Sequence, residues 1–206
     1  MIGLRCTSLR NAMDLFLAIC QAVGLALAVG IGGPLAALFI VVMASLEAGI
    51  DVTGTDFEFL GEPWFATAIF AVNVVVYLTR RSELSLRLPL IVFAAAFGAI
   101  AGGASRAEEG EAMAIGLVIG ATVGAATAVL AGDVLAGAQR RSRSAGEGAE
   151  TAATLGLIFA VAGIGAAALA LFVPPAAIAL LIALVVLASG RRRRAGEKYE
   201  GLRILR

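Results

Sequence analysis

The first apolar run of the chain, residues 13–46, reads MDLFLAICQAVGLALAVGIGGPLAALFIVVMASL and carries no charge besides Asp14. A transmembrane helix needs roughly 20 apolar residues, so this run is too long for one straight crossing. Its centre holds the sequence GIGGP at 30–34. Pro34 removes a helical hydrogen bond, and the glycines permit non-helical backbone dihedrals. We therefore predict a single crossing with a break at this point, the alternative being a simple proline kink.

The chain as a whole has the composition of a membrane protein. Of its 206 residues, 60% are hydrophobic and 15% are charged, and its mean hydropathy is +0.96. Soluble domains are about half apolar and about a quarter charged. The other apolar runs are 63–79, 88–105, 112–139, 152–173 and 175–190. This pattern predicts an all-α integral membrane protein, and it excludes a soluble enzyme, a nucleic-acid-binding domain and a disordered chain.

Basic and acidic residues follow different runs. The arginines next to the first, second, fourth and sixth runs are Arg5, Arg10, Arg80, Arg81, Arg87, Arg140, Arg141, Arg143 and Arg191–Arg194. The loop after the first run carries only acidic residues, namely Glu47, Asp51, Asp56, Glu58 and Glu62. Basic residues favour the cytoplasmic side of a membrane. We therefore predict six crossings with both termini in the cytoplasm, an arrangement that leaves only Arg106 outside.

These six crossings divide into two halves of opposite orientation. The first repeat covers 13–105 and the second covers 112–190, within a single transmembrane domain at 1–190, and 191–206 form a basic cytoplasmic tail. Each half opens with an over-long, Gly-rich helix followed by two ordinary crossings. The sequence therefore predicts a 3+3 inverted-topology repeat. A second break is expected near 124–127, where proline is absent.

Inverted repeats with interrupted helices are typical of secondary transporters. A break frees backbone N–H and C=O groups, which lipid cannot satisfy and a bound ligand can. Polar side chains at membrane depth are costly and often functional. The residues predicted to line a substrate or ion pathway are Gly30, Gly32, Gly33, Pro34, Gly124, Thr127, Asp133, Gln21 and Asn73.

Each polar member of this set also has a structural interpretation. Gln21 and Asn73 would join helices by hydrogen bonds, and Thr127 would bond to its own helix. Asp133 would pair with Arg140 or Arg143 near the cytoplasmic surface. As a functional group, Asp133 would instead carry a proton or bind a coupling cation.

Small residues recur at every fourth position along the fourth run. They are Ala112, Gly116, Gly120, Gly124, Ala128, Gly132 and Ala136. Such stripes allow helix backbones to approach closely. We expect packing within the chain, with the first helix as the partner, and a homodimer interface is the alternative.

The residue inventory offers little for catalysis. The chain has no His, its only Lys is Lys198, and its two cysteines, Cys6 and Cys20, form no metal-binding motif. We expect no enzyme activity, no cofactor, no metal site and no nucleic-acid partner. The pattern favours a small secondary transporter or lipid-linked-substrate translocase that works by alternating access, with protons or sodium as coupling ions. The alternatives are a membrane scaffold or assembly partner and a dimeric channel. The expected partners are the lipid bilayer and an ion, small-molecule or lipid substrate.

Two segments carry a family resemblance. The stretch Gly24–Phe39, GLALAVGIGGPLAALF, and the loop segment Phe57–Trp64, FEFLGEPW, are similar to the small prokaryotic membrane proteins grouped as domain-of-unknown-function family number 4126. The resemblance covers about 13–190. It implies a helical fold in the inner membrane of a prokaryotic cell, as a multi-pass protein, and it implies no particular activity.

Overall fold

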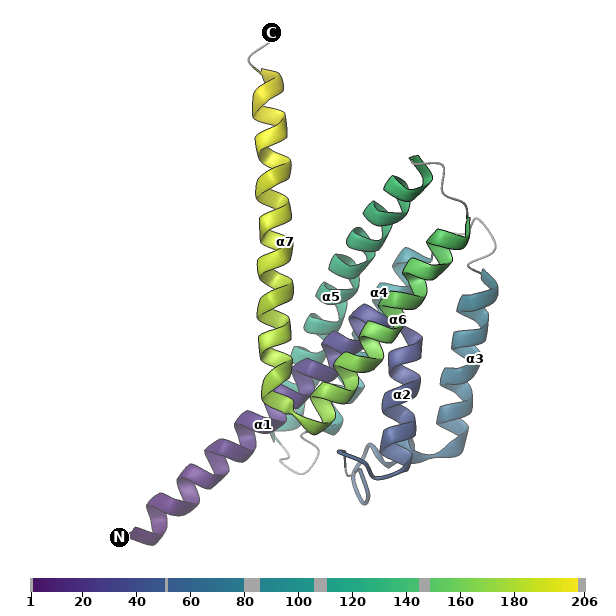
Figure 1. The fold of residues 1–206 in the computed structure, drawn as a ribbon. Coiled ribbons are helices and arrows are strands. Elements are labelled where there is room, and N and C mark those ends of the chain that lie inside the picture. The colour runs from purple at the N-terminus through teal and green to yellow at the C-terminus, as the bar shows by residue number, and fades with distance from the viewer. Residues whose placement is uncertain (1, 51, 80–85, 106–110, 145–148, 204–206) are drawn as a thin grey trace.

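The computed structural model describes residues 2–50, 52–79, 86–105, 111–144 and 149–203, and the regular secondary structure within them is helical, with no strand (Figure 1). The α-helices are α1 (Ile2–Gly32), α2 (Pro34–Ser45), α3 (Pro63–Thr79), α4 (Arg87–Ala104), α5 (Glu111–Ser144), α6 (Ala149–Phe172) and α7 (Pro174–Arg203). A short 3-10 helix, η1 (Glu58–Gly61), precedes α3. The predicted all-α class is therefore confirmed.

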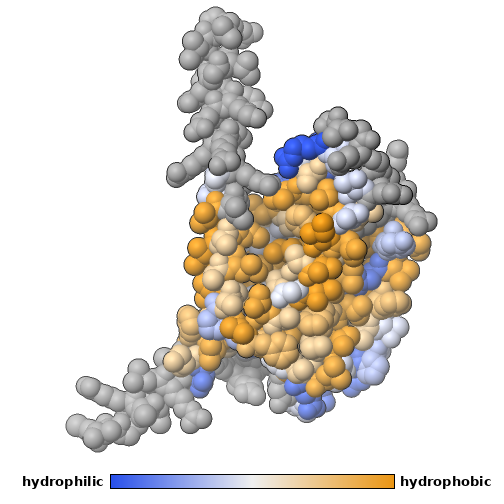
Figure 2. All heavy atoms as spheres, viewed as in Figure 1, coloured by the Kyte–Doolittle hydropathy of each residue, from blue (hydrophilic) through white to orange (hydrophobic). Residues whose placement is uncertain are grey.

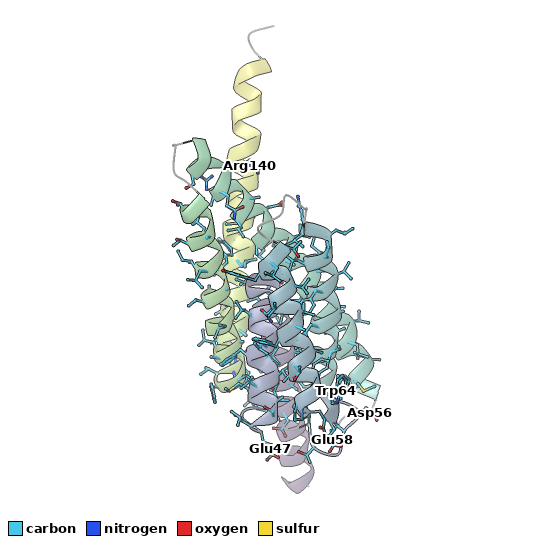
Figure 3. The ribbon with its side chains drawn as sticks, turned by 90° about the vertical axis from the view of Figure 1, so that its right-hand side faces the viewer. Glu47, Asp56, Glu58, Trp64 and Arg140 are labelled. Carbon is cyan, nitrogen blue, oxygen red and sulfur yellow. The ribbon has the colours of Figure 1, made fainter. Side chains whose placement is uncertain are left out.

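The first apolar run folds back on itself. At Gly33 the chain leaves α1 and returns along α2, so the start of α1 and the loop after α2 lie at the same end of the molecule (Figure 1). Figure 3 shows Glu47, Asp56 and Glu58 at this end, which we call the acidic end, and Arg140 at the opposite, basic end. This reversal differs from the predicted single crossing, and it places the two chain termini at opposite ends (Figure 1).

The fourth run contains no break. Helix α5 continues from Glu111 to Ser144, so the interruption predicted at 124–127 is wrong. Pro34 and a glycine with positive φ occur together only at the first break, whereas Gly and Ala alone are compatible with a packed membrane helix. The two predicted halves therefore open with different structures, a hairpin in the first and a straight helix in the second.

Close packing of backbones holds the helices together. Helix α1 is central and packs against α4, α5, α6 and α7. The small-residue stripe of α5 packs within the chain as predicted, but its main partner is α4 rather than α1. On α4, Ala94, Gly98 and Gly102 meet the stripe, and a Cβ added at Gly98 would lie 2.5 Å from the carbonyl oxygen of Gly120.

The outer surface matches a membrane environment. Among the described residues, four helical segments are long and apolar enough to cross a membrane: Met13–Gly32, Arg87–Ala104, Met113–Ser142 and Ala153–Phe172. Shorter apolar helices are Pro34–Ser45, Pro63–Thr79 and Pro174–Val186. Figure 2 shows hydrophobic side chains over most of the face in view, with hydrophilic groups near its upper and lower ends. The chain is thus a membrane-associated helical protein.

Candidate functional site at the helix break

The break between α1 and α2 has a backbone conformation that only glycine adopts readily. Gly33 has φ 62° and ψ −144°, which lies outside the regions open to residues with a side chain. Its N–H donates to the Val29 carbonyl at 2.8 Å, and its own carbonyl accepts from the Ala37 N–H at 3.2 Å. Because Pro34 has no N–H, the carbonyl of Gly30 lacks its usual donor four residues later. The break therefore leaves polar backbone inside the bundle.

This break lies halfway along the surrounding helices. Gly30 lies against Thr127, which is at the middle of α5, and Gly32 lies against Gly163, close to the middle of α6. A Cβ added at Gly32 would lie 2.8 Å from the Cα atom of Gly163, so α1 and α6 touch backbone to backbone. If α5 and α6 cross the membrane, the break lies near mid-depth.

A pocket of about 80 Å³ surrounds the break. It is lined by Val29, Gly30, Ile31, Gly32, Gly33, Pro34, Leu90, Ala128, Ala131, Gly132, Leu135, Gly156, Phe159 and Ala160. All these side chains are apolar or absent, so the polar groups that reach the pocket belong to the backbone. A cavity needs about 10–15 Å³ of free space to hold one water molecule, and the pocket therefore has room for a few waters, an ion or a small solute.

The structure brings some of the predicted pathway residues to this pocket. Gly30, Gly32, Gly33 and Pro34 line it.

The other predicted pathway residues lie behind it or away from it. Thr127 is buried behind Gly30 and donates to the Val123 carbonyl of its own helix at 2.7 Å. Gly124 packs on Ala94 of α4. Gln21 lies toward the acidic end, where its Nε2 donates to the Gly49 carbonyl at 2.6 Å.

Asn73 joins α3 to the break. Its Nδ2 donates to the Pro34 carbonyl and to the Ile69 carbonyl, both at 2.9 Å. It is the one predicted polar side chain that bonds directly to the broken segment. Its position supports the interpretation that it joins helices.

Asp133 forms an ion pair with Arg87 rather than with Arg140, and the side chain of Arg143, the other expected partner, lies outside the described residues. Arg87 Nη2 lies 2.7 Å from Asp133 Oδ1, and the two side chains are 60% and 56% exposed. Gly132 and Leu135 line the pocket, but Asp133 does not. Asp133 therefore connects α5 to the start of α4 at the surface.

The role of Arg87 as the partner of Asp133 was not predicted from the sequence. Ala94, Gly98 and Gly102 recur every four residues, like the stripe of α5, and this shared period was the available signal. Pairing the two stripes in antiparallel helices brings the start of α4 beside the last turns of α5, where Asp133 lies.

We expect Asn73→Leu to lower the free energy of unfolding by about 1 kcal/mol, because it removes the bonds to Pro34 and Ile69. Thermal unfolding in detergent measures the change. Thr67→Val is the matched control on α3, since Thr67 Oγ1 donates only to the Pro63 carbonyl of its own helix. Equal effects of the two variants would contradict a role for Asn73 at the break.

The site has no sign of metal chemistry within the described residues, where no group of three or more His, Cys, Asp or Glu side chains comes together. Comparisons with protein-family models, with curated proteins and with solved structures found no match for this chain. The function is therefore argued from the geometry of the break and its pocket.

Proposed function

We propose that this chain is a small membrane transporter whose substrate site is the pocket at the α1–α2 break. The observation that supports this most directly is an interrupted helix at the middle of the bundle whose backbone lines a pocket. Interrupted helices of this kind form the substrate and ion sites of secondary transporters. Alternating access would then require the helices around the pocket to open it first to one side of the membrane and then to the other.

The same geometry supports a revised topology. Helix α2 has 12 residues and is about 18 Å long, against a hydrocarbon thickness of about 30 Å. Met13–Gly32 is long enough to cross, but α1 runs obliquely through the bundle and ends at the break (Figure 1). Helices α1 and α2 would therefore form a re-entrant hairpin that enters from the acidic end, and α3 to α7 would make five crossings. Re-entrant backbone is tolerated only inside the protein or beside a cavity, as at this pocket. The positive-inside rule assigns the basic end to the cytoplasm, and the family resemblance suggests a prokaryotic inner membrane.

The chemistry of the pocket favours a small ion. At the break, the C-terminal end of α1 presents carbonyl groups and carries partial negative charge, while the N-terminal end of α2 carries partial positive charge. Carbonyl groups such as that of Gly30 would hold a cation such as sodium, without a carboxylate in the pocket. Asp133 lies outside the pocket lining, so this mechanism does not use it for coupling.

Flux in proteoliposomes tests the proposal. We expect saturable uptake of one member of a panel of monovalent cations, small anions and small metabolites. Gly132→Leu should abolish it, because Gly132 lines the pocket and an added Cβ would meet no atom within 4 Å, which leaves the side chain room to fill the pocket. Gly137→Leu is the control on the same helix, since it has equal space but lies outside the pocket lining.

Asp133→Asn supplies a further control and should retain wild-type flux. Loss of flux in Asp133→Asn with full flux in Gly132→Leu would overturn the assignment of the site. Absence of any flux above the protein-free background, saturating or not, for the whole panel would favour the scaffold alternative over transport.

A channel is the second candidate function. Half-helices that meet in the middle of a bundle also build pores, in which backbone carbonyls replace the hydration shell of an ion. The same flux assay separates the two, because a channel gives flux that rises without saturation over the concentrations at which a transporter saturates.

A further inference from the structure

A second, larger cavity lies between α3 and α4. Helix α3 forms one edge of the bundle and packs mainly on α2 and η1, whereas α4 packs on α5 and α1 (Figure 1). The two helices meet through Phe65 and Phe97, whose ring centroids are 6.4 Å apart. Beyond this contact they enclose a groove of about 370 Å³, within the usual range for ligand pockets of roughly 300–1,000 Å³.

Every residue that lines this groove is apolar. The lining residues are Pro34, Ala71, Val72, Val75, Val76, Leu86, Pro89, Leu90 and Phe93. A groove without a polar group cannot orient a sugar, a nucleotide or a peptide, and the medium around a membrane-spanning bundle offers it hydrocarbon chains. Its inner end reaches Pro34 and Leu90, which also line the pocket at the break.

Positive charge lies beside the groove. Arg87 is in the first turn of α4, between the lining residues Leu86 and Pro89, and its side chain is 60% exposed. A guanidinium has five N–H donors, and the ion pair with Asp133 joins a single nitrogen, Nη2, to one carboxylate oxygen. Donors therefore remain for an anion at this end of the groove, and guanidinium groups bind phosphate well.

We propose that the α3–α4 groove binds an acyl chain of an anionic phospholipid whose phosphate contacts Arg87. The hydrocarbon lining holds the acyl chain. The arginine at the basic end sets the depth at which the headgroup lies and favours a negatively charged headgroup. Arginines near a membrane surface favour anionic lipids by about fivefold each, which corresponds to about 1 kcal/mol. This site requires only that the bundle spans a membrane, and it does not depend on the transport proposed above.

Native mass spectrometry of the full chain tests the proposal. The protein, in detergent, is mixed with phosphatidylglycerol and phosphatidylcholine of equal chain length. We expect one tightly retained lipid per chain and a preference of about fivefold for phosphatidylglycerol. Arg87→Gln should remove the preference while one lipid still binds. Asp133→Asn should keep or increase it, because Arg87 then has no competing carboxylate.

Filling the groove is the second arm. Val76→Trp places a large ring among the lining residues and should remove the retained lipid. Val161→Trp on α6, which is 59% exposed and lines neither cavity, is the matched control and should bind lipid as the wild type does. Equal loss in both tryptophan variants would mean non-specific surface lipid and would overturn the site.

Two further outcomes would contradict the proposal. An unchanged lipid preference in Arg87→Gln would show that this arginine does not bind the headgroup. A stable dimer without retained lipid, broken up by Val76→Trp, would assign the groove to a second copy of the chain. Transport in the flux assay is a separate readout, so either proposal can fail while the other stands.

Discussion

Gly120→Ala is expected to lower the free energy of unfolding by about 3 kcal/mol, the upper end of the usual cost of overpacking. An added Cβ at Gly120 would overlap the carbonyl group of Gly98, and Gly102 Cα would lie 3.2 Å away. These neighbours are backbone atoms of α4, which cannot rotate aside as a flexible side chain does. Relief would require α4 and α5 to separate along their shared stripe.

Gly137→Ala is the matched control on α5 and should change stability in the opposite direction. An added Cβ at Gly137 would meet no atom within 4 Å, and Ala is favoured over Gly in a helix by up to about 1 kcal/mol. Thermal unfolding of both variants in the same detergent measures the difference. If Gly120→Ala were as stable as Gly137→Ala, the close approach of α4 and α5 would be absent in solution.

The stripe of α5 illustrates how far sequence periodicity reaches. Small residues at every fourth position predict close contact with another helix, and this was confirmed. Helix α1, the expected partner, does pack against α5, but the main partner is α4, because several helices carry small residues at this spacing. The pairing of α5 with α4 depends on how well the row Ala94, Gly98 and Gly102 fits the stripe of α5 along its whole length. Such a fit depends on the shapes of both helix surfaces, which the spacing of small residues in one helix does not give.

The position of the helix break was predicted from local residues, but the direction that the chain takes after the break was not. Glycines followed by Pro34 predict an interruption, and the structure has one at Gly33. A kink and a reversal require the same local residues, so the sequence does not distinguish them. The positive-inside rule favoured a single crossing because it placed Arg5 and Arg10 on the opposite side of the membrane from the acidic loop. The preference of two arginines for one side is small compared with the packing energy of a whole hairpin.

The candidate site shows the same limit for polar side chains. The backbone positions Gly30, Gly32, Gly33 and Pro34 were predicted and line the pocket. Asp133 was chosen because a carboxylate at membrane depth is costly, but helical periodicity does not tell which neighbouring helix or cavity its face of α5 meets. Its partner, Arg87, is 46 residues away and was accessible only through the pairing of α4 with α5.

Gly33→Ala has the second large expected effect, a loss of about 1–3 kcal/mol in the free energy of unfolding. The cause is conformational rather than steric. An added Cβ at Gly33 would meet no atom within 4 Å, but φ of 62° with ψ of −144° is strained for any residue with a side chain. The same substitution in a continuous helix would raise stability by up to about 1 kcal/mol, so the sign of the change separates a break from a kinked helix.

Gly165→Ala provides the control for this prediction. Gly165 lies inside α6, also has open space around an added Cβ, and has no positive φ, so its replacement should be neutral or stabilising. The two variants are compared by thermal unfolding in detergent and by flux in proteoliposomes. Gly33→Ala should lose most of the flux of the wild type at a temperature where it remains folded, because straightening the break would withdraw the Gly30 carbonyl from the pocket. Full flux in a folded Gly33→Ala protein would mean that transport does not use the break.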